Sequence, residues 1–302
     1  MSSDKMDVLR ELYRRYKLDE FDRGIVKSGD ILRAMKDTKS TLGTANPANF
    51  LKDLIRKRNV NDNWPAEIWA DRVGARQRYG EKRVFQFVDR HSWPTAFIDR
   101  FDPTDETECY IVQTASLPHL ARSLGRKDET WLTQVAVNLR LVETQLAVYS
   151  SAELKSRIRD VTHLQMSIKT RPEIDAAYIV SYANKNARGA DLNMFVTCEA
   201  KHFGERILED QILEQVKVAF QITKKHRDRP IDAVKPIAIQ VLDTIATGES
   251  ERAIYVVEFK HFLRSEFELI DHSSDLEAIY DIPLEKVSST LYLLRPLIAG
   301  FS

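Results

Sequence analysis

Residues 172–216, PEIDAAYIVSYANKNARGADLNMFVTCEAKHFGERILEDQILEQV, decide the fold predicted for this chain. The β-rich run 174–182 predicts one strand, and the short apolar run 195–198 predicts a second strand that ends in charged residues. Within 209–222 the apolar residues recur at three- and four-residue spacing, which predicts a helix with one buried face. The stretch therefore predicts two strands followed by a helix.

Three charged side chains lie on these two strands. Asp175 lies inside the first strand, and Glu199 and Lys201 close the second. Side chains at positions i and i+2 of a strand point to the same face, so Glu199 and Lys201 share a face while Ala200 faces the core. If the two strands are neighbours, the Asp175 carboxylate lies beside Glu199 and Lys201 on that face. The sequence thus predicts a site with two carboxylates and one lysine.

Two carboxylates that converge with a backbone carbonyl supply the hard oxygen ligands that Mg²⁺ prefers. We therefore expect Asp175, Glu199 and the carbonyl of Ala200 to bind Mg²⁺. Such an ion polarises a phosphate oxygen, generates hydroxide from a bound water and stabilises the leaving oxygen. Lys201 is expected to stabilise the transition state first and to transfer protons second, because two carboxylates beside a lysine favour its charged form.

Acidic-x-Lys triplets occur by chance at this composition, and the three that begin with glutamate start at Glu153, Glu199 and Glu258. The first closes a helical run, where the side chains at i and i+2 diverge. The third is the stronger rival, because it follows a strand and because Asp243 lies near an earlier strand end. An alternative site would therefore consist of Asp243, Glu258 and Lys260.

Two features favour the triplet that begins at Glu199. Glu173 places a second acid at the start of the strand that carries Asp175. The following helix presents Gln211 and Gln215 one turn apart, after polar and acidic residues in its first turn.

The runs EIDAAYI, CEAK and DQILEQV resemble the core of the PD-(D/E)XK nucleases, and of the type II restriction endonucleases in particular. The resemblance covers roughly residues 130–260. It implies a mixed sheet flanked by helices, Mg²⁺-dependent cleavage of phosphodiester bonds, double-stranded DNA as the substrate and often a homodimer. The family also implies a cognate DNA methyltransferase as a functional partner.

On this sequence the family's first carboxylate falls on Asp175, its second on Glu199 and its lysine on Lys201. A glutamate from the helix before the first strand commonly supports such a site in the family. Glu143 is the candidate for this role, with Glu153 as the reserve. The sequence departs from the family pattern in two ways: the proline that names the motif does not precede Asp175 directly, and the loop between the motif strands is long and polar.

Two segments carry donors that suit phosphates and base edges: the loop between the motif strands and the basic run after the predicted helix. Their candidate DNA-binding residues are Asn184, Lys185, Asn186, Arg188, Lys224, Lys225 and Arg227. Each segment also has a plain alternative, since a hairpin loop is ordinarily solvated and basic residues at a helix end interact with the helix dipole.

Composition excludes several classes of protein. The 302 residues are 43% hydrophobic and 30% charged without a repetitive tract, which excludes collagen-like, mucin-like, disordered and coiled-coil proteins. Two cysteines cannot build a disulfide framework, and the charged start MSSDKMDVLRELYRRYK lacks the apolar core of a signal peptide. No apolar run approaches the roughly 20 residues that span a bilayer. A cytoplasmic protein is therefore predicted.

The charge is distributed unevenly along the chain. Residues 1–80 contain 17 Lys and Arg against 12 Asp and Glu, whereas residues 240–302 contain 5 against 11. Residues 1–80 are predicted to form a small helical module that either contacts DNA or packs on a larger domain. Residues 81–302 are predicted to form the nuclease domain, an α/β fold with a mixed sheet flanked by helices.

Within residues 81–302, a long helix is expected from 129 to 148, and the acidic C-terminal stretch is expected to be mostly helical.

The leading functional hypothesis is a sequence-specific, Mg²⁺-dependent DNA endonuclease. Within enzymes, the alternative is a repair or junction-resolving nuclease with the same core, which would recognise the structure of DNA rather than its sequence. Outside enzymes, the alternative is a DNA-binding protein on a nuclease-like scaffold, which would bind DNA without cleaving it.

Overall fold

The chain forms two compact units in a computed structural model that describes residues 3–43, 46–184, 191–225, 231–244, 251–272 and 276–301. The N-terminal unit contains the described residues up to Arg100 and the segment Gly204–Asp210. The sheet unit contains 101–203 and the described residues from Gln211 onward. The division therefore falls after Arg100, and not after residue 80 as expected, because residues 83–89 form a strand that pairs inside the N-terminal unit.

The helices expected in residues 1–80 are present in the N-terminal unit, and they pack with a small antiparallel sheet of strand order β1-β3-β2. The Met6, Leu9 and Leu12 stripe of the first helix packs into this unit's own apolar core. The helices are α1 Ser3–Lys17, α2 Ser28–Asp37, α3 Lys52–Ile55 and α4 Ala66–Ala70, with 3₁₀ turns at Asp22–Gly24, Pro47–Asn49 and Asn61–Asn63. The strands are β1 Ile25–Lys27, β2 Val73–Gln77 and β3 Arg83–Asp89.

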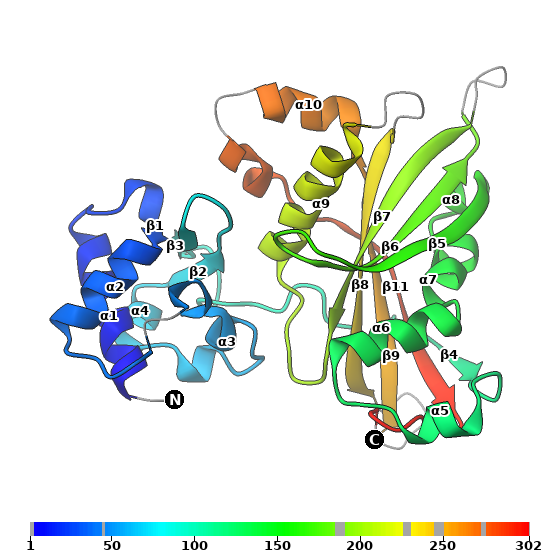
Figure 1. Cartoon of the computed structure of the whole chain (residues 1–302), viewed down its shortest axis with the longest axis horizontal. Helices are drawn as coiled ribbons and strands as arrows, with labels where there is room; N and C mark the ends of the chain where they lie inside the picture. The colour runs from blue at the N-terminus through cyan, green and yellow to red at the C-terminus, as the bar shows by residue number, and fades with distance from the viewer. Residues whose placement is uncertain are drawn as a thin grey trace. The chain divides into compact units, whose positions relative to one another are not determined.

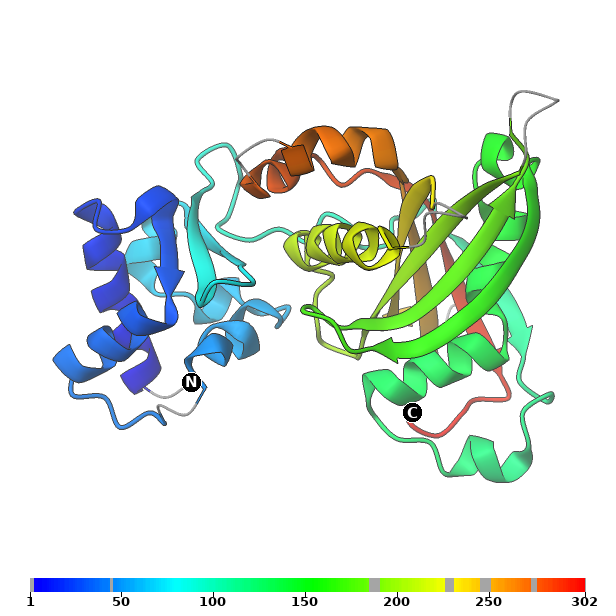
Figure 2. The same ribbon diagram turned by 45° about the horizontal axis from the view of Figure 1, so that its top comes forward.

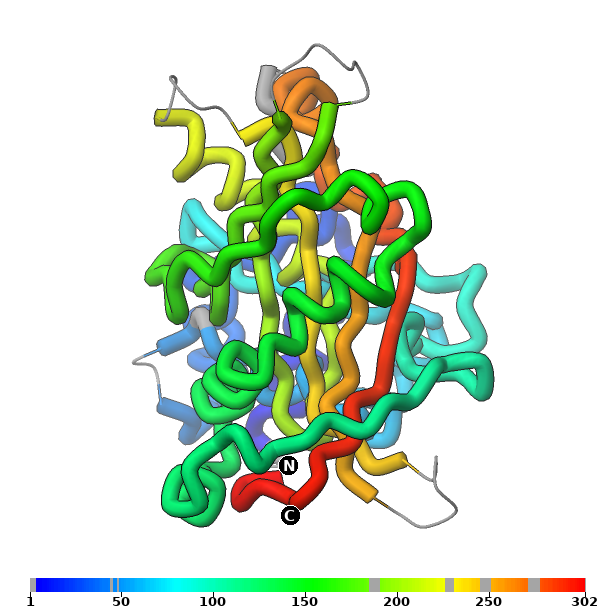
Figure 3. Tube along the Cα trace, turned by 90° about the vertical axis from the view of Figure 1, so that its right-hand side faces the viewer, coloured from blue at the N-terminus to red at the C-terminus, as the bar shows by residue number. Residues whose placement is uncertain are grey.

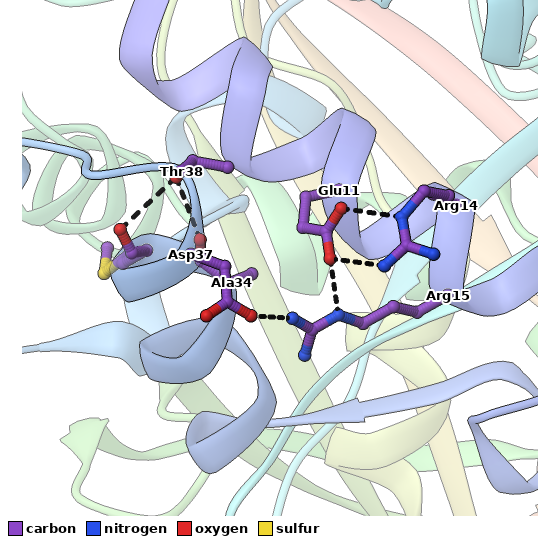
Figure 4. A network of polar contacts seen from close by, with 7 residues as sticks. Glu11, Arg14, Arg15, Ala34, Asp37 and Thr38 are labelled. Atoms are coloured by element: carbon purple, nitrogen blue, oxygen red, sulfur yellow. Dashed lines mark hydrogen bonds and ion pairs between the residues drawn. The ribbon is translucent and has the colours of Figure 1, made fainter.

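Several basic residues of the N-terminal unit are paired with acids of the same unit. Figure 4 shows Arg15 between α1 and α2, where it donates to Glu11 at 2.8 Å and to Asp37 at 2.5 Å. Arg15 is only 4% exposed, and Arg14 also donates to Glu11. Arg15, one of the basic residues in the surplus of residues 1–80, therefore connects α1 to α2 and does not face solvent.

The sheet unit is built on an eight-stranded mixed sheet within the described residues (Figure 1). Its strand order is β4-β11-β9-β8-β7-β6-β5, with β10 paired to β8. The strands are β4 Glu108–Gln113, β5 Ile158–Ile168, β6 Ile174–Tyr182, β7 Leu192–Lys201, β8 Ala233–Thr244, β9 Glu251–Phe259, β10 Phe262–Leu263 and β11 Lys286–Arg295. The α/β class with a mixed, helix-flanked sheet is confirmed, and Figure 2 shows how β5, β6 and β7 curl.

Helices cover both faces of this sheet. In Figure 3 the segment that carries α6 and α7 crosses the strands on the near side, whereas α9 and α10 lie on the other side in Figure 1. The helices are α5 His119–Ser123, α6 Glu129–Asn138, α7 Leu141–Thr144, the π-helix Gln145–Tyr149, α8 Ala152–Lys155, α9 Glu209–Thr223, α10 Arg264–His272 and the 3₁₀ helix Leu276–Asp281. None of the described helices is long and apolar enough to cross a membrane.

The single long helix expected over 129–148 is wrong. Helix α6 ends at Asn138, and Arg140 adopts a left-handed conformation with φ 53° before α7 begins. The break redirects the chain, so that Leu132 and Val135 on one side and Leu146 on the other bury against the same curved sheet. Periodicity alone does not reveal such a break, since both halves keep helical spacing.

The expectation of a mostly helical C-terminal stretch is wrong for its last part. Strand β11 inserts between β4 and β9, parallel to β4 and antiparallel to β9. Only the second half of β11 is buried, so the alternation of apolar and polar residues that indicates a strand is weak in its sequence. The pairing partners that define it lie far away along the chain.

Two glycines of the N-terminal unit are expected to respond oppositely to replacement by alanine. A Cβ on Gly74 would lie 2.5 Å from the carbonyl oxygen of Ala96, whereas a Cβ on Gly29, in the first turn of α2, meets nothing within 4 Å. Gly74→Ala should lower the free energy of unfolding by about 1–3 kcal/mol through overpacking. Gly29→Ala should leave it unchanged or raise it by up to about 1 kcal/mol. Urea unfolding followed by circular dichroism measures both, and equal stability of the two variants would contradict the packing at Gly74.

Candidate active site

Strands β6 and β7 are antiparallel neighbours, as the site prediction requires. Their register pairs Ala176 with Cys198, which places Asp175 directly across from Glu199. Ala176 and Cys198 face the apolar core under α6, whereas Asp175 and Glu199 face α9. The structure therefore brings the two carboxylates together on one face of the sheet.

Asp175 is held by the backbone of the neighbouring strand. The backbone N–H of Ala200 donates to a carboxylate oxygen of Asp175 at 2.7 Å. Burial, followed by the charge of Glu199, raises the pKa of Asp175 to about 8, although the Ala200 N–H and Lys201 act in the opposite direction. A proton or a cation is thus needed on this carboxylate near neutral pH.

Glu199 and Lys201 form a buried ion pair. Glu199 is 2% exposed and Lys201 is 1% exposed, and the Lys201 ammonium donates to one oxygen of Glu199. The ammonium also donates to Oε1 of Gln211 at 3.2 Å. Nε2 of Gln215 donates to the other oxygen of Glu199 and to the backbone carbonyl of Glu173. Helix α9 therefore orients both members of the pair through two glutamines one turn apart.

The donor set at this position fits a magnesium ion. Gln215 Oε1 is buried and has no hydrogen-bond partner among the described residues, although its amide lies against Glu199. An unpaired oxygen beside two buried carboxylates suits a hard cation. The described residues contain no group of three or more His, Cys, Asp or Glu side chains arranged as a metal site. Asp175 and Glu199 supply two carboxylates at this position, and Mg²⁺ held by one or two carboxylates commonly keeps several waters.

Glu143, predicted to support the site, lies elsewhere. It belongs to α7, whose Leu141 and Val142 pack into the apolar core on the face of the sheet opposite to Glu199. Burial raises the pKa of Glu143, and its Oε2 has no hydrogen-bond partner among the described residues.

The carboxylate of the preceding helix whose charge acts on Asp175 is Glu129, at the first residue of α6. Glu153, the reserve, is 67% exposed at its side chain and lies 3.9 Å from Arg157.

The rival site is not assembled. Asp243 pairs in register with Arg252 at one end of β8 and β9, whereas Glu258 pairs with Ile237 further along these strands. Glu258 is fully buried and accepts from the hydroxyls of Ser150 and Ser288, with Lys235 at 2.6 Å. Lys260 pairs instead with Glu285 at the surface. These residues therefore form a structural ion-pair network and a surface pair.

The predicted DNA-binding residues lie far from the carboxylates where they are described. Asn184 follows the end of β6, nine residues beyond Asp175, or about 30 Å along a strand. Lys224 and Lys225 are exposed after the end of α9, and Lys224 lies about 14 Å along the helix from Gln215, which contacts Glu199. Lys185, Asn186, Arg188 and Arg227 lie outside the described residues. The expectation that these residues bind DNA remains a prediction.

Comparisons of the chain with family models, with curated proteins and with solved structures found no match.

The raised pKa of Asp175 predicts a pH-dependent effect of Asp175→Asn in metal-free protein. Between the ordinary value of 3.8 and about 8, folded Asp175 binds a proton that the unfolded chain releases. The contribution of Asp175 to stability therefore falls as pH rises across this range and levels off above about 8. Asn keeps an acceptor for the Ala200 N–H but carries no charge. In urea unfolding with EDTA, the change in the free energy of unfolding caused by Asp175→Asn should be more stabilising above pH 8 than at mildly acid pH. An equal change at both pH values would contradict the raised pKa of Asp175.

The buried pair of Glu199 and Lys201 predicts strong coupling in a double-mutant cycle. Glu199→Gln leaves a buried ammonium without its counter-charge and should cost about 3 kcal/mol or more of unfolding free energy. Lys201→Met leaves an unpaired carboxylate and should cost a similar amount. Because the double variant leaves no unpaired charge, it should lose much less than the sum of the two single losses. Additive losses in urea unfolding would mean that the two charges do not interact.

Proposed function

We propose that this chain is a magnesium-dependent nuclease that hydrolyses phosphodiester bonds of double-stranded DNA. The observation that supports this best is the convergence of Asp175 and Glu199 on one sheet face, with Lys201 paired to one of them. Two carboxylates and a lysine on adjacent strands match the residues that the PD-(D/E)XK resemblance assigns. No other acidic-x-Lys triplet in the described residues forms such a site.

Asp175 and Glu199 would hold the ion together with the Ala200 carbonyl that the sequence predicts, and Gln215, whose Oε1 is buried without a partner among the described residues, contacts Glu199 through its Nε2. When bound, Mg²⁺ supplies a Lewis acid that polarises phosphate and acidifies water. The Ala200 N–H fixes one oxygen of Asp175, and Gln215 fixes one oxygen of Glu199. These hydrogen bonds hold the carboxylates in place before any substrate arrives, which lowers the reorganisation needed for reaction.

Lys201 supplies the positive charge of the chain itself. Its ammonium already contacts Glu199 and Gln211 and is buried, so its charge acts in a medium that screens it weakly. We assign it the stabilisation of negative charge on the phosphate during attack. We assign it proton transfer as a second role.

The resemblance to type II restriction endonucleases supports a finer proposal: cleavage at a specific sequence, a homodimer and a cognate methyltransferase as a functional partner. A repair or junction-resolving nuclease would use the same residues on DNA selected by its structure. Incubation with unmethylated phage DNA and Mg²⁺ separates the two, because a sequence-specific enzyme produces discrete bands.

Cleavage should depend on the site residues and on the metal. Asp175→Ala and Lys201→Ala should abolish cleavage but keep DNA binding, because these side chains act on the phosphate and not on the bases. Mg²⁺ and Mn²⁺ should support cleavage, whereas Ca²⁺ should bind without turnover because it is larger and acidifies water less. Gel electrophoresis of the products and a mobility-shift assay measure the two activities.

Asp243→Ala is the matched control, since Asp243 is a half-exposed acid on a neighbouring strand end that pairs with Arg252. It should cleave at the rate of the unaltered protein. Cleavage that proceeds in EDTA would reject the metal assignment. Retained cleavage in both Asp175→Ala and Lys201→Ala would reject the site.

A further inference from the structure

Two tryptophans and two arginines meet at one end of the β2–β3 hairpin in the N-terminal unit. Val73 at the start of β2 pairs with Asp89 at the end of β3. Trp69 and Arg72 immediately precede this pair, and Arg90 and Trp93 follow it. We call these four residues the Trp/Arg cluster. The backbone N–H of Arg90 donates to the carbonyl of Arg72 at 2.8 Å, so the two halves of the cluster are joined directly.

The cluster consists of two indole–guanidinium stacks. The guanidinium carbon of Arg72 lies 5.0 Å from the ring centre of Trp69, and that of Arg90 lies 3.9 Å from the ring centre of Trp93. Nη1 of Arg72 also lies 3.5 Å from the carbonyl oxygen of Trp93. Trp69 is 36% exposed, whereas Trp64 nearby in the chain is 5% exposed and donates to a backbone carbonyl. The cluster thus places flat, cationic and partly exposed surfaces side by side.

The acids around the cluster have partners of their own. Asp71 accepts from the hydroxyl of Tyr13 at 2.5 Å and from Lys17 at 3.2 Å. Asp89 accepts from the backbone N–H of His91 and lies 2.9 Å from its ring. Neither guanidinium of the cluster forms an ion pair with a carboxylate of the described residues, although the charges of Glu209 and Asp210 act on Arg90 at longer range. The cluster therefore keeps positive charge that an anionic ligand can use.

We propose that the Trp/Arg cluster binds unpaired bases of DNA by stacking. An exposed indole or a stacked guanidinium presents a flat face to a base, and arginine adds attraction to the backbone phosphates. Bases inside a duplex are covered by their neighbours, so such a surface selects single-stranded segments, ends or extruded bases. The choice of DNA rests on the proposed nuclease function. The cluster itself belongs to a unit that contains none of the proposed catalytic residues.

Fluorescence tests the inference with full-length protein in EDTA and a labelled oligothymidylate as the probe. The oligothymidylate should quench the tryptophan fluorescence of the unaltered protein, because stacked bases quench indoles. The double variant Trp69→Ala/Trp93→Ala should bind the single strand at least about tenfold more weakly than the unaltered protein does, with duplex binding unchanged. Trp69→Phe/Trp93→Phe should retain most of the binding and lose the quenching, since the remaining Trp64 and Trp131 lie outside the cluster. This second variant decides the question even if the alanine variant does not fold.

Arg33→Ala is the matched control for charge alone, since Arg33 is exposed on α2 of the same unit. It should not reduce oligothymidylate binding by more than about twofold, in line with the loss of one peripheral phosphate contact. The inference is overturned if the single strand does not quench the unaltered protein, or if the alanine variant loses single strand and duplex equally. Cleavage of duplex DNA with Mg²⁺ is measured separately: cleavage without stacking rejects this inference alone, and stacking without cleavage rejects the nuclease proposal alone.

Discussion

The pleat of β6 and β7 sends alternate side chains to opposite faces of one sheet, and the rest of the sheet unit depends on this alternation. On one face Ala176, Tyr178 and Cys198 join the core covered by α6 and α7. On the other face Asp175, Glu199 and Lys201 meet the polar side of α9. A slip of one residue would turn Glu199 and Lys201 into the apolar core, so the fold and the candidate site are specified by the same register.

Burying three charged groups in this sheet is costly unless each charge is compensated. Glu199 and Lys201 compensate each other, and the amides of Gln211 and Gln215 hold them in place. Asp175 accepts a backbone N–H, yet burial, followed by the charge of Glu199, raises its pKa to about 8. Without a proton on Asp175 the site carries one uncompensated negative charge, and a divalent cation between the carboxylates would compensate it. The same imbalance connects the stability of the fold to the function that we propose.

Much of this arrangement could be predicted from the sequence because it is local. Strand β6 begins and ends where its composition indicates, and the i, i+2 spacing of Glu199 and Lys201 predicts a shared face. The parts that could not be predicted depend on contacts between distant segments. The break at Arg140 ends α6 before α7 begins, and Glu143 on α7 lies on the face of the sheet opposite to Glu199.

Strand β11 and the pairing of β3 within the N-terminal unit likewise depend on partners far away in sequence. The sequence did contain one usable signal that the site prediction left unassigned, since Gln211 and Gln215 are spaced to share the face of α9 that meets β7.

The central claim is that Asp175 and Glu199 together hold a divalent cation. Crystals grown with Mn²⁺ test it directly when diffraction is recorded at the manganese absorption edge, because the anomalous signal locates the ion without reference to activity. We expect one strong peak between the two carboxylates, within reach of Gln215, and its loss in Asp175→Asn. A peak only elsewhere in the molecule, or one that persists unchanged in Asp175→Asn, would contradict it.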